Sequence, residues 1–160
     1  MTQSHPTWIG HTIADRYKIE SQLGQGGMST VFKATDANLR RTVAVKLIHP
    51  HLSESEEFVQ RFELEAEAVA QLHHPNIIQV YDFAHDVQIY YMILRYVPGE
   101  TLQDRLKNAT ATNQRLPLAE TIRIMTIVGE AASYAHQQGM IHRDLKPSNV
   151  ILDDKDEPIL

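Results

Sequence analysis

The spacing of apolar residues changes near Pro98-Gly99, and this change constrains the fold more than any other feature of the sequence. Before this point, apolar residues alternate with polar ones in short runs, a pattern typical of half-buried strands. After it, they recur every three or four residues, as they do in helices. A strand-rich part followed by a helix-rich part predicts an α+β fold with two lobes.

The first part of the chain predicts an antiparallel sheet of five strands and one main helix. The expected strands cover residues 17–23, 30–35, 42–48, 77–83 and 89–96. Phe58, Phe62 and Val69 recur at helical intervals, and Ser55 precedes them as a capping hydroxyl. We therefore expect a helix over about 55–72.

The second part predicts a short helix over 101–107, a polar loop over 108–115 and a long helix over 118–137. Gly139 follows the long helix at the usual left-handed cap position. The chain then divides into a lead-in over 1–15, a first lobe over 16–97 and an incomplete, mainly helical second lobe over 98–160. The long helix is apolar on more than one face, so we expect an exposed patch and a partner that covers it.

Composition excludes several classes of function. The formal net charge of −5 gives no bulk attraction to nucleic acid, and the absence of cysteine excludes disulfides and cysteine-ligated metal centres. No apolar run is long enough to cross a bilayer, and Met1–Gly10 lacks the pattern of a signal peptide. We expect a cytoplasmic chain with no membrane segment, although a longer protein could carry an anchor downstream.

Three glycines, Gly24, Gly26 and Gly27, separate the first two predicted strands. A hairpin tip without side chains lets backbone N–H groups approach phosphate oxygens, although a glycine-rich hairpin with no ligand fits this feature equally well. In the third strand, Ala44 and Lys46 share one face. A flat ring can lie against the alanine while the lysine reaches phosphates, so the two features together predict a nucleotide site.

Lys46 needs a counter-charge, because an unpaired ammonium group inside a sheet is costly. The predicted helix offers Glu63, Glu65 and Glu67. Glu65 lies three and four positions from the apolar residues of the buried stripe, so we predict Glu65 as the partner. Glu63 and Glu67 are the alternatives.

The segment HRDLKPSN, residues 142–149, follows the long helix. Phosphoryl transfer needs placement and charge compensation from a protein. Asp144 can orient a hydroxyl and accept its proton, Lys146 can neutralise a phosphoryl group, and Asn149 offers an oxygen ligand to Mg²⁺. His142 is expected to brace the loop. A surface turn with scattered charges is the plainer alternative.

In this order, GQGGMSTV, VAVK and HRDLKPSN resemble the protein kinase family, and HRDLKP is the serine/threonine form. ADRY and LHHPNII resemble the bacterial, eukaryotic-like members in particular. The resemblance implies a protein-kinase-like fold, ATP with Mg²⁺ or Mn²⁺ as cofactors, and transfer of a phosphoryl group to serine or threonine hydroxyls of a protein substrate.

The resemblance also implies roles for matching positions. Leu94 would be the gatekeeper, Arg95 and Val97 would offer backbone groups to adenine, and Ile151 would form the floor below the ring. The implied catalytic residues are Lys46, Glu65, Asp144 and Lys146, and the implied metal ligand is Asn149. The implied nucleotide-binding residues are Leu23, Gly24, Gln25, Gly26, Gly27, Met28, Ser29, Thr30, Val31, Ala44, Lys46, Leu94, Arg95, Val97 and Ile151.

In the family an Asp-Phe-Gly segment follows the catalytic loop, and its aspartate holds the metal. This sequence reaches Leu160 without it. The chain is therefore expected to be a kinase fragment, truncated before that motif and inactive by itself. The alternative is a non-catalytic nucleotide-binding or docking module that regulates a complete kinase. The intact Lys46, Glu65, Asp144 and Asn149 favour the enzyme.

Overall fold

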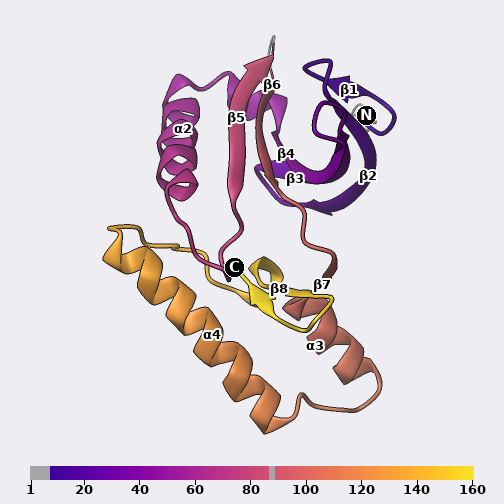
Figure 1. The fold of residues 1–160 in the computed structure, drawn as a ribbon, viewed down its shortest axis with the longest axis vertical. Helices are drawn as coiled ribbons and strands as arrows, with labels where there is room; N and C mark the ends of the chain where they lie inside the picture. The colour runs from indigo at the N-terminus through magenta and orange to yellow at the C-terminus, as the bar shows by residue number, and fades with distance from the viewer. Residues whose placement is uncertain (1–7, 87–88) are drawn as a thin grey trace. The chain divides into compact units, whose positions relative to one another are not determined.

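The structure, a computed structural model, describes residues 8–86 and 89–160. Residues 1–7 of the predicted lead-in lie outside the described residues. Two compact units are present (Figure 1). One comprises the residues up to Ala70 together with Val80–Tyr96, and the other comprises Gln71–Gln79 together with Val97–Leu160.

The first unit is built on a six-stranded sheet in which every neighbouring pair is antiparallel. The strand order is β1-β2-β3-β4-β6-β5. The strands are β1 (Thr12–Ile13), β2 (Tyr17–Gln25), β3 (Ser29–Asp36), β4 (Arg41–Ile48), β5 (Val80–Asp86) and β6 (Ile89–Arg95). The prediction of five strands misses β1, because two residues are too few to show an alternating pattern.

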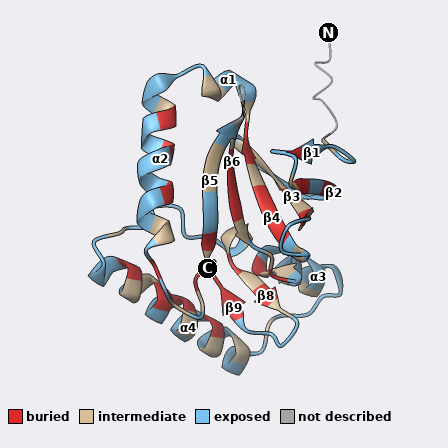
Figure 2. Cartoon of the chain, turned by 45° about the horizontal axis from the view of Figure 1, so that its top comes forward, coloured by how far each residue is buried: buried red, intermediate tan, exposed pale blue. Residues whose placement is uncertain are grey.

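Apolar side chains cover both faces of this sheet. One face carries a buried cluster that includes Ile19, Phe32, Val45 and Ile93. The other face packs against α2 (Glu56–Ala70), which buries Val59, Phe62 and Ala66 along one side, red in Figure 2. A short helix, α1 (Pro50–Ser53), precedes α2.

The predicted cap of α2 is present. The Oγ of Ser55 accepts a hydrogen bond from the backbone N–H of Phe58 at 3.3 Å. Glu56 and Glu57 occupy the first turn, where carboxylates favour the positive end of the helix dipole.

The strand predicted over 77–83 begins later than expected, at Val80. Ile77 packs in the second unit, in a cluster with Leu72, Ala131 and Ala135. The backbone of this segment pairs with the end of the chain, because the N–H of Ile78 donates to the carbonyl of Leu160 at 2.8 Å. The apolar residues of this segment give the sequence pattern of a strand, but the segment belongs to the second unit and not to the six-stranded sheet.

The second unit contains α3 (Leu102–Ala111), α4 (Leu118–Gln137) and a single 3₁₀ turn, η1 (Pro147–Asn149). A three-stranded antiparallel sheet joins β7 (Gly99–Thr101), β8 (Ile151–Asp153) and β9 (Pro158–Ile159). α4 has the predicted bounds, and Gly139 has a φ of +82°. α3 is longer than predicted and takes in the first residues of the expected loop. In the described ranges, no helix is long and apolar enough to cross a membrane.

Candidate functional site

The glycine-rich hairpin connects β2 to β3. Gly26 donates its N–H to the carbonyl of Ser29 at 2.8 Å. In the two strands next to this turn, Gln25 lies opposite Thr30 and Gly24 lies opposite Val31. Leu23 and Met28 are exposed. None of the three hairpin glycines has a positive φ, and a Cβ added at Gly24 or Gly27 would meet nothing within 4 Å. The fold itself does not require glycine here, which leaves bare backbone that a ligand can approach.

The candidate adenine and phosphate contacts of the first unit share one face of the sheet. Val31 lies opposite Lys46 on the neighbouring strand, and Ala44 lies opposite Leu94. Directly opposed residues in a sheet point to the same side. This is also the face that packs against α2, because Leu94 belongs to that cluster. The sheet therefore brings four predicted nucleotide residues from three strands onto one surface.

Lys46 is only partly buried in β4. Its Nζ lies 5.6 Å from the centroid of the Phe62 ring of α2, a distance at which a cation is attracted to the ring face. Glu65 is exposed, and within residues 8–86 and 89–160 no ion pair joins it to Lys46. The structure thus differs from the predicted pairing. Glu65 lies at the edge of the buried stripe of α2, and the ring of Phe62 from that stripe is what faces the lysine.

A second lysine on the same sheet face escaped the sequence analysis. Lys33 lies opposite Ala44, 3.4 Å from the Oε2 of Glu20 and 5.7 Å from the ring centroid of Tyr96. The signal was present in the alternation of β3, since Lys33 lies two positions after Val31. Unlike Lys46, Lys33 has a carboxylate partner, so the two lysines are chemically distinct.

Two other predicted nucleotide residues lie where β6 leaves the sheet. Arg95 is the last residue of β6, opposite Val43, and its side chain is exposed. Val97 is buried and begins the chain segment that belongs to the second unit. Ile151 starts β8, opposite Thr101 and Ile159, and is partly buried.

The candidate catalytic residues of the second unit form one hydrogen-bonded group. The Nζ of Lys146 lies 2.8 Å from the Oδ2 of Asp144. Asn149 donates from Nδ2 to the same Oδ2 at 3.1 Å and to the backbone carbonyl of Asp144 at 2.8 Å. These contacts bring together three predicted residues that lie up to five positions apart.

The Asp144 carboxylate is kept ionised by its neighbours. The hydrogen bond from Lys146 lowers the pKa of Asp144, and the bond from Asn149 lowers it further. The side chain is exposed, so solvent also reaches it. An ionised carboxylate accepts hydrogen bonds only, which suits it to orient a hydroxyl group.

The backbone of the loop fixes Asp144. The N–H of Asp144 donates to the carbonyl of His142 at 2.8 Å and lies 3.3 Å from Nδ1 of the same residue, consistent with the expected bracing role. Arg143 between them has a φ of +61°, a left-handed conformation that costs a non-glycine residue free energy. Pro147 begins η1, whose turn carries Asn149 back towards Asp144, and the buried Val150 anchors the end of the segment.

The donors for a divalent metal are few. Asn149 offers one neutral amide oxygen, and across the described ranges no group of three or more histidine, aspartate or glutamate side chains gathers to hold a metal. Mg²⁺ is usually held by carboxylates and substrate phosphates together. The residues present therefore do not fit a protein-held metal centre, although Asn149 can contribute one ligand to a metal–phosphate complex.

Comparisons with known proteins bear on these groups. A model of the family described as "Protein kinase domain" matches residues 17–160. A probable serine/threonine-protein kinase of Clostridium acetobutylicum is 38% identical over 148 residues, which are 92% of this chain and 22% of the relative. The serine/threonine-protein kinase PrkC of Bacillus subtilis is 38% identical over 145 residues, 91% of this chain and 22% of that protein.

Solved structures agree with the sequence relatives. The crystal structure of the Mycobacterium tuberculosis PknI kinase domain matches with a TM-score of 0.80 and 32% identity. The match covers 94% of this chain and 60% of that chain. The present chain thus spans about a fifth of the curated relatives and 60% of the solved domain.

Proposed function

The chain belongs to the protein kinase family, and from this premise we propose that it supplies the ATP-binding and catalytic-loop residues of a serine/threonine protein kinase. The observation that carries the proposal is the group of Asp144, Lys146 and Asn149, joined by contacts of 2.8–3.1 Å. The reaction is transfer of the terminal phosphoryl group of ATP to a serine or threonine hydroxyl of a protein substrate.

Each group has a physical task in this reaction. Bare backbone at the glycine hairpin and the ammonium of Lys46 stabilise phosphate charge, while Val31, Ala44 and Leu94 provide an apolar surface for adenine. Asp144 accepts a hydrogen bond from the substrate hydroxyl and takes its proton as the oxygen attacks the γ-phosphorus and the bond from that phosphorus to the departing ADP breaks. Lys146 offsets negative charge on the transferring group. A Mg²⁺ ion bound with ATP would neutralise the phosphates, with Asn149 as one ligand.

ATP binding tests the first part of the proposal. We expect Mg-ATP to raise the melting temperature of the chain, and Lys46→Ala to weaken the affinity roughly tenfold to a hundredfold, the loss typical of a charge-assisted contact. Lys18→Ala, which removes an exposed lysine of β2, is the matched control and should bind as the wild type does. Equal binding by both variants would refute the assignment of Lys46.

A second candidate function is a regulatory module that binds nucleotide without transferring phosphate, and phosphoryl transfer by this chain would exclude it. The second candidate is favoured by one observation, the exposed Glu65 that forms no ion pair with Lys46 within the ranges described. The 160 residues contain no Asp-Phe-Gly, and loss of one preorganised electrostatic group costs about 10²–10³ in rate. We therefore expect this chain alone to phosphorylate a generic protein no faster than its Asp144→Ala variant. Transfer above that control would show that the chain alone is active and would exclude the regulatory module.

A further inference from the structure

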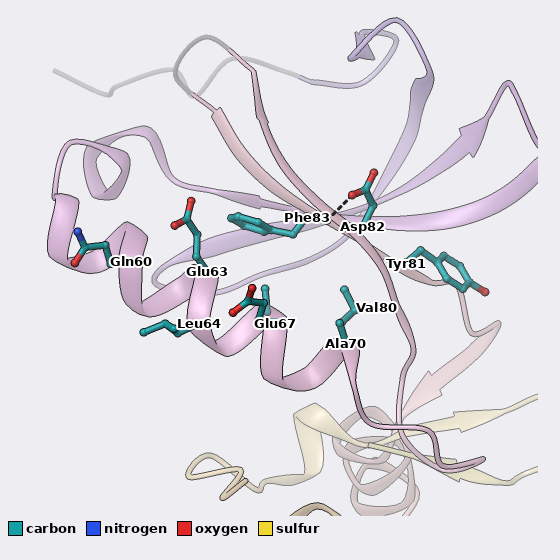
Figure 3. A pocket seen from close by; sticks show the side chains of 10 residues that line it. Gln60, Glu63, Leu64, Glu67, Ala70, Val80, Tyr81, Asp82 and Phe83 are labelled. Carbon is teal, nitrogen blue, oxygen red and sulfur yellow. Dashed lines mark hydrogen bonds between the residues drawn. The ribbon is translucent and has the colours of Figure 1, made fainter. Parts of the chain in front are cut away.

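A groove lies between α2 and β5 within the first unit, outside the residues assigned above (Figure 3). Its volume is about 600 Å³. α2 contributes Gln60, Glu63, Leu64 and Glu67, which fall at helical spacings of three and four and so form one stripe beside the buried stripe. The inner surface of the groove is apolar and includes Ala66, Ala70, Val80 and Phe83.

The rim of this groove carries negative charge without a cation. Glu63 and Glu67 are four positions apart, a spacing at which like charges weaken a helix. In the part of the chain that the structure describes, neither carboxylate forms an ion pair. On the same helix Glu57 is paired with Arg61, so the helix does pair a carboxylate where a cation is available.

An apolar side chain is exposed at the outer edge of the α2 stripe, on the side away from β5 (Figure 3). Leu64 is 65% exposed, although it lies on the groove stripe. From the other side of the groove, Phe83 extends from β5 towards Glu63, whereas Tyr81 and Asp82 point away from α2 (Figure 3). The groove therefore combines an apolar floor, one exposed leucine and two carboxylates that lack a counter-charge.

We infer that this groove binds a basic amphipathic peptide segment of a partner protein. One apolar residue of that segment lies against Phe83 on the groove floor and another covers Leu64 at its outer edge, and flanking lysine or arginine residues pair with Glu63 and Glu67. An anionic ligand would be repelled, and an entirely apolar ligand would desolvate the carboxylates without compensation. A second copy of this chain would bring a net charge of −5 to the groove, not the basic segment that Glu63 and Glu67 would pair with. The inference depends only on α2 and β5 and stands apart from the proposed function.

Binding of synthetic peptides to the 160-residue chain tests this inference. Three fluorescent peptides of equal length are compared by anisotropy: one alternates lysine and leucine, one replaces each leucine with serine, and one replaces each lysine with glutamate. We expect the lysine–leucine peptide to bind at least about tenfold more tightly than either of the others, and more weakly as salt rises, because exposed ion pairs are screened.

Variants locate the binding. Glu63→Gln with Glu67→Gln should weaken binding of the lysine–leucine peptide about tenfold, since two exposed ion pairs are lost. Glu130→Gln with Asp154→Asn removes the same charge at exposed positions of the second unit and should leave binding unchanged. Because Glu63, Glu67 and Leu64 are exposed, these variants are expected to fold, and circular dichroism checks that they do. Leu64→Ser provides an independent test and should lower the preference for leucine over serine in the peptide.

Three results would overturn the inference. One is equal binding of the lysine–leucine and lysine–serine peptides, which would indicate non-specific attraction. Another is unchanged binding by the Glu63→Gln, Glu67→Gln variant. The third is self-association of the chain that this double variant abolishes, which would assign the groove to a second copy.

Discussion

Asp36 is a fully buried carboxylate at the end of β3. Its two oxygens accept hydrogen bonds of 2.8 Å from the Nε and Nη2 of Arg16. The backbone N–H groups of Asn38 and Leu39 donate to Oδ1 at 3.1 and 3.2 Å. The hydrogen bonds from Arg16 are the main cause that lowers the pKa of Asp36 to about 2. This one residue therefore ties Arg16, which immediately precedes β2, to the end of β3 and to the turn that follows β3.

We expect Asp36 to make the first unit sensitive to acid. The folded-state pKa of about 2 lies below the ordinary value for aspartate of about 4, so the ionised form favours folding. The stabilisation is complete above about pH 4 and is lost as the pH falls through 2; it amounts to about 2 kcal/mol. The measurement is urea unfolding of the wild type and of Asp36→Asn between pH 7 and pH 2.

Asp36→Asn should lose about 2 kcal/mol less of its free energy of unfolding on acidification than the wild type does. It should also be less stable at pH 7, because it leaves Arg16 without its carboxylate partner. Asp154→Asn, a change at an exposed aspartate, should keep the pH dependence of the wild type. If Asp36→Asn and the wild type lose the same stability on acidification, the assignment of this effect to Asp36 is wrong.

Glu65 shows what a residue pattern does not determine. Helical spacing correctly places Glu65 on α2, beside the buried stripe. Whether its carboxylate reaches Lys46 depends on side-chain direction and on what fills the intervening space, and here the Phe62 ring faces the lysine. In contrast, the contacts among Asp144, Lys146 and Asn149 follow from their closeness in sequence and from the turn at Pro147.

At the scale of elements, replacing either of two glycines with alanine should change the stability of the second unit in opposite directions. Gly99 in β7 has a φ of +149°, and a Cβ added there would lie 1.9 Å from the carbonyl oxygen of Leu152 in β8. Gly99→Ala should therefore separate β7 from β8 and destabilise the second unit by roughly 3 kcal/mol, through strain at a backbone conformation reserved for glycine. Thermal or urea unfolding followed by circular dichroism measures the loss.

Gly129 provides the matched substitution. It lies inside α4, and a Cβ added there would meet nothing within 4 Å. Gly129→Ala should stabilise the second unit by roughly 0.5–1 kcal/mol, because alanine loses less backbone freedom in a helix than glycine does. A destabilised Gly129→Ala variant, or an unaffected Gly99→Ala variant, would contradict this account.

The elements that sequence predicts best are those with long periodic patterns. α4 has the predicted bounds because its twenty residues give several helical repeats, and β3 is found because its buried positions alternate. α3 extends past its prediction, although Asn108 and Thr110 within it are weak helix formers and Thr112 is its C-cap. The hydroxyls of Thr110 and Thr112 donate to carbonyls of the preceding turn. Helix propensities of single residues do not include such local hydrogen bonds, so the sequence prediction ended the helix too early.

At the scale of the whole molecule, α4 has two apolar sides with different surroundings. Ile124, Val128, Ala131 and Ala135 are buried within the second unit. The second stripe, formed by Leu118, Ile122 and Met125, is 75%, 57% and 59% exposed. These three residues fall at spacings of four and three, so they form a continuous apolar surface of the kind that promotes association.

We expect this stripe to cause concentration-dependent self-association of the chain. Replacing Leu118, Ile122 and Met125 together with serine should keep the chain monomeric at concentrations where the wild type forms larger species, because the exposed apolar area is removed. Size-exclusion chromatography with light scattering measures the mass. The buried stripe is untouched, so the fold should tolerate the changes, apart from a cost of a few tenths of a kcal/mol for each serine in the helix.

A control triple variant separates the stripe from a general gain in polarity. Leu39, Leu106 and Ile141 are 58%, 38% and 64% exposed, but they lie in the β3–β4 turn, in α3 and after α4, so serine at these positions removes apolar residues without removing a continuous surface. This control should associate as the wild type does, because scattered apolar side chains are tolerated on protein surfaces whereas a contiguous patch is not. The α4 stripe is not the cause if the wild-type chain stays monomeric at high concentration. The same conclusion follows if the control variant associates as little as the variant with serine at Leu118, Ile122 and Met125.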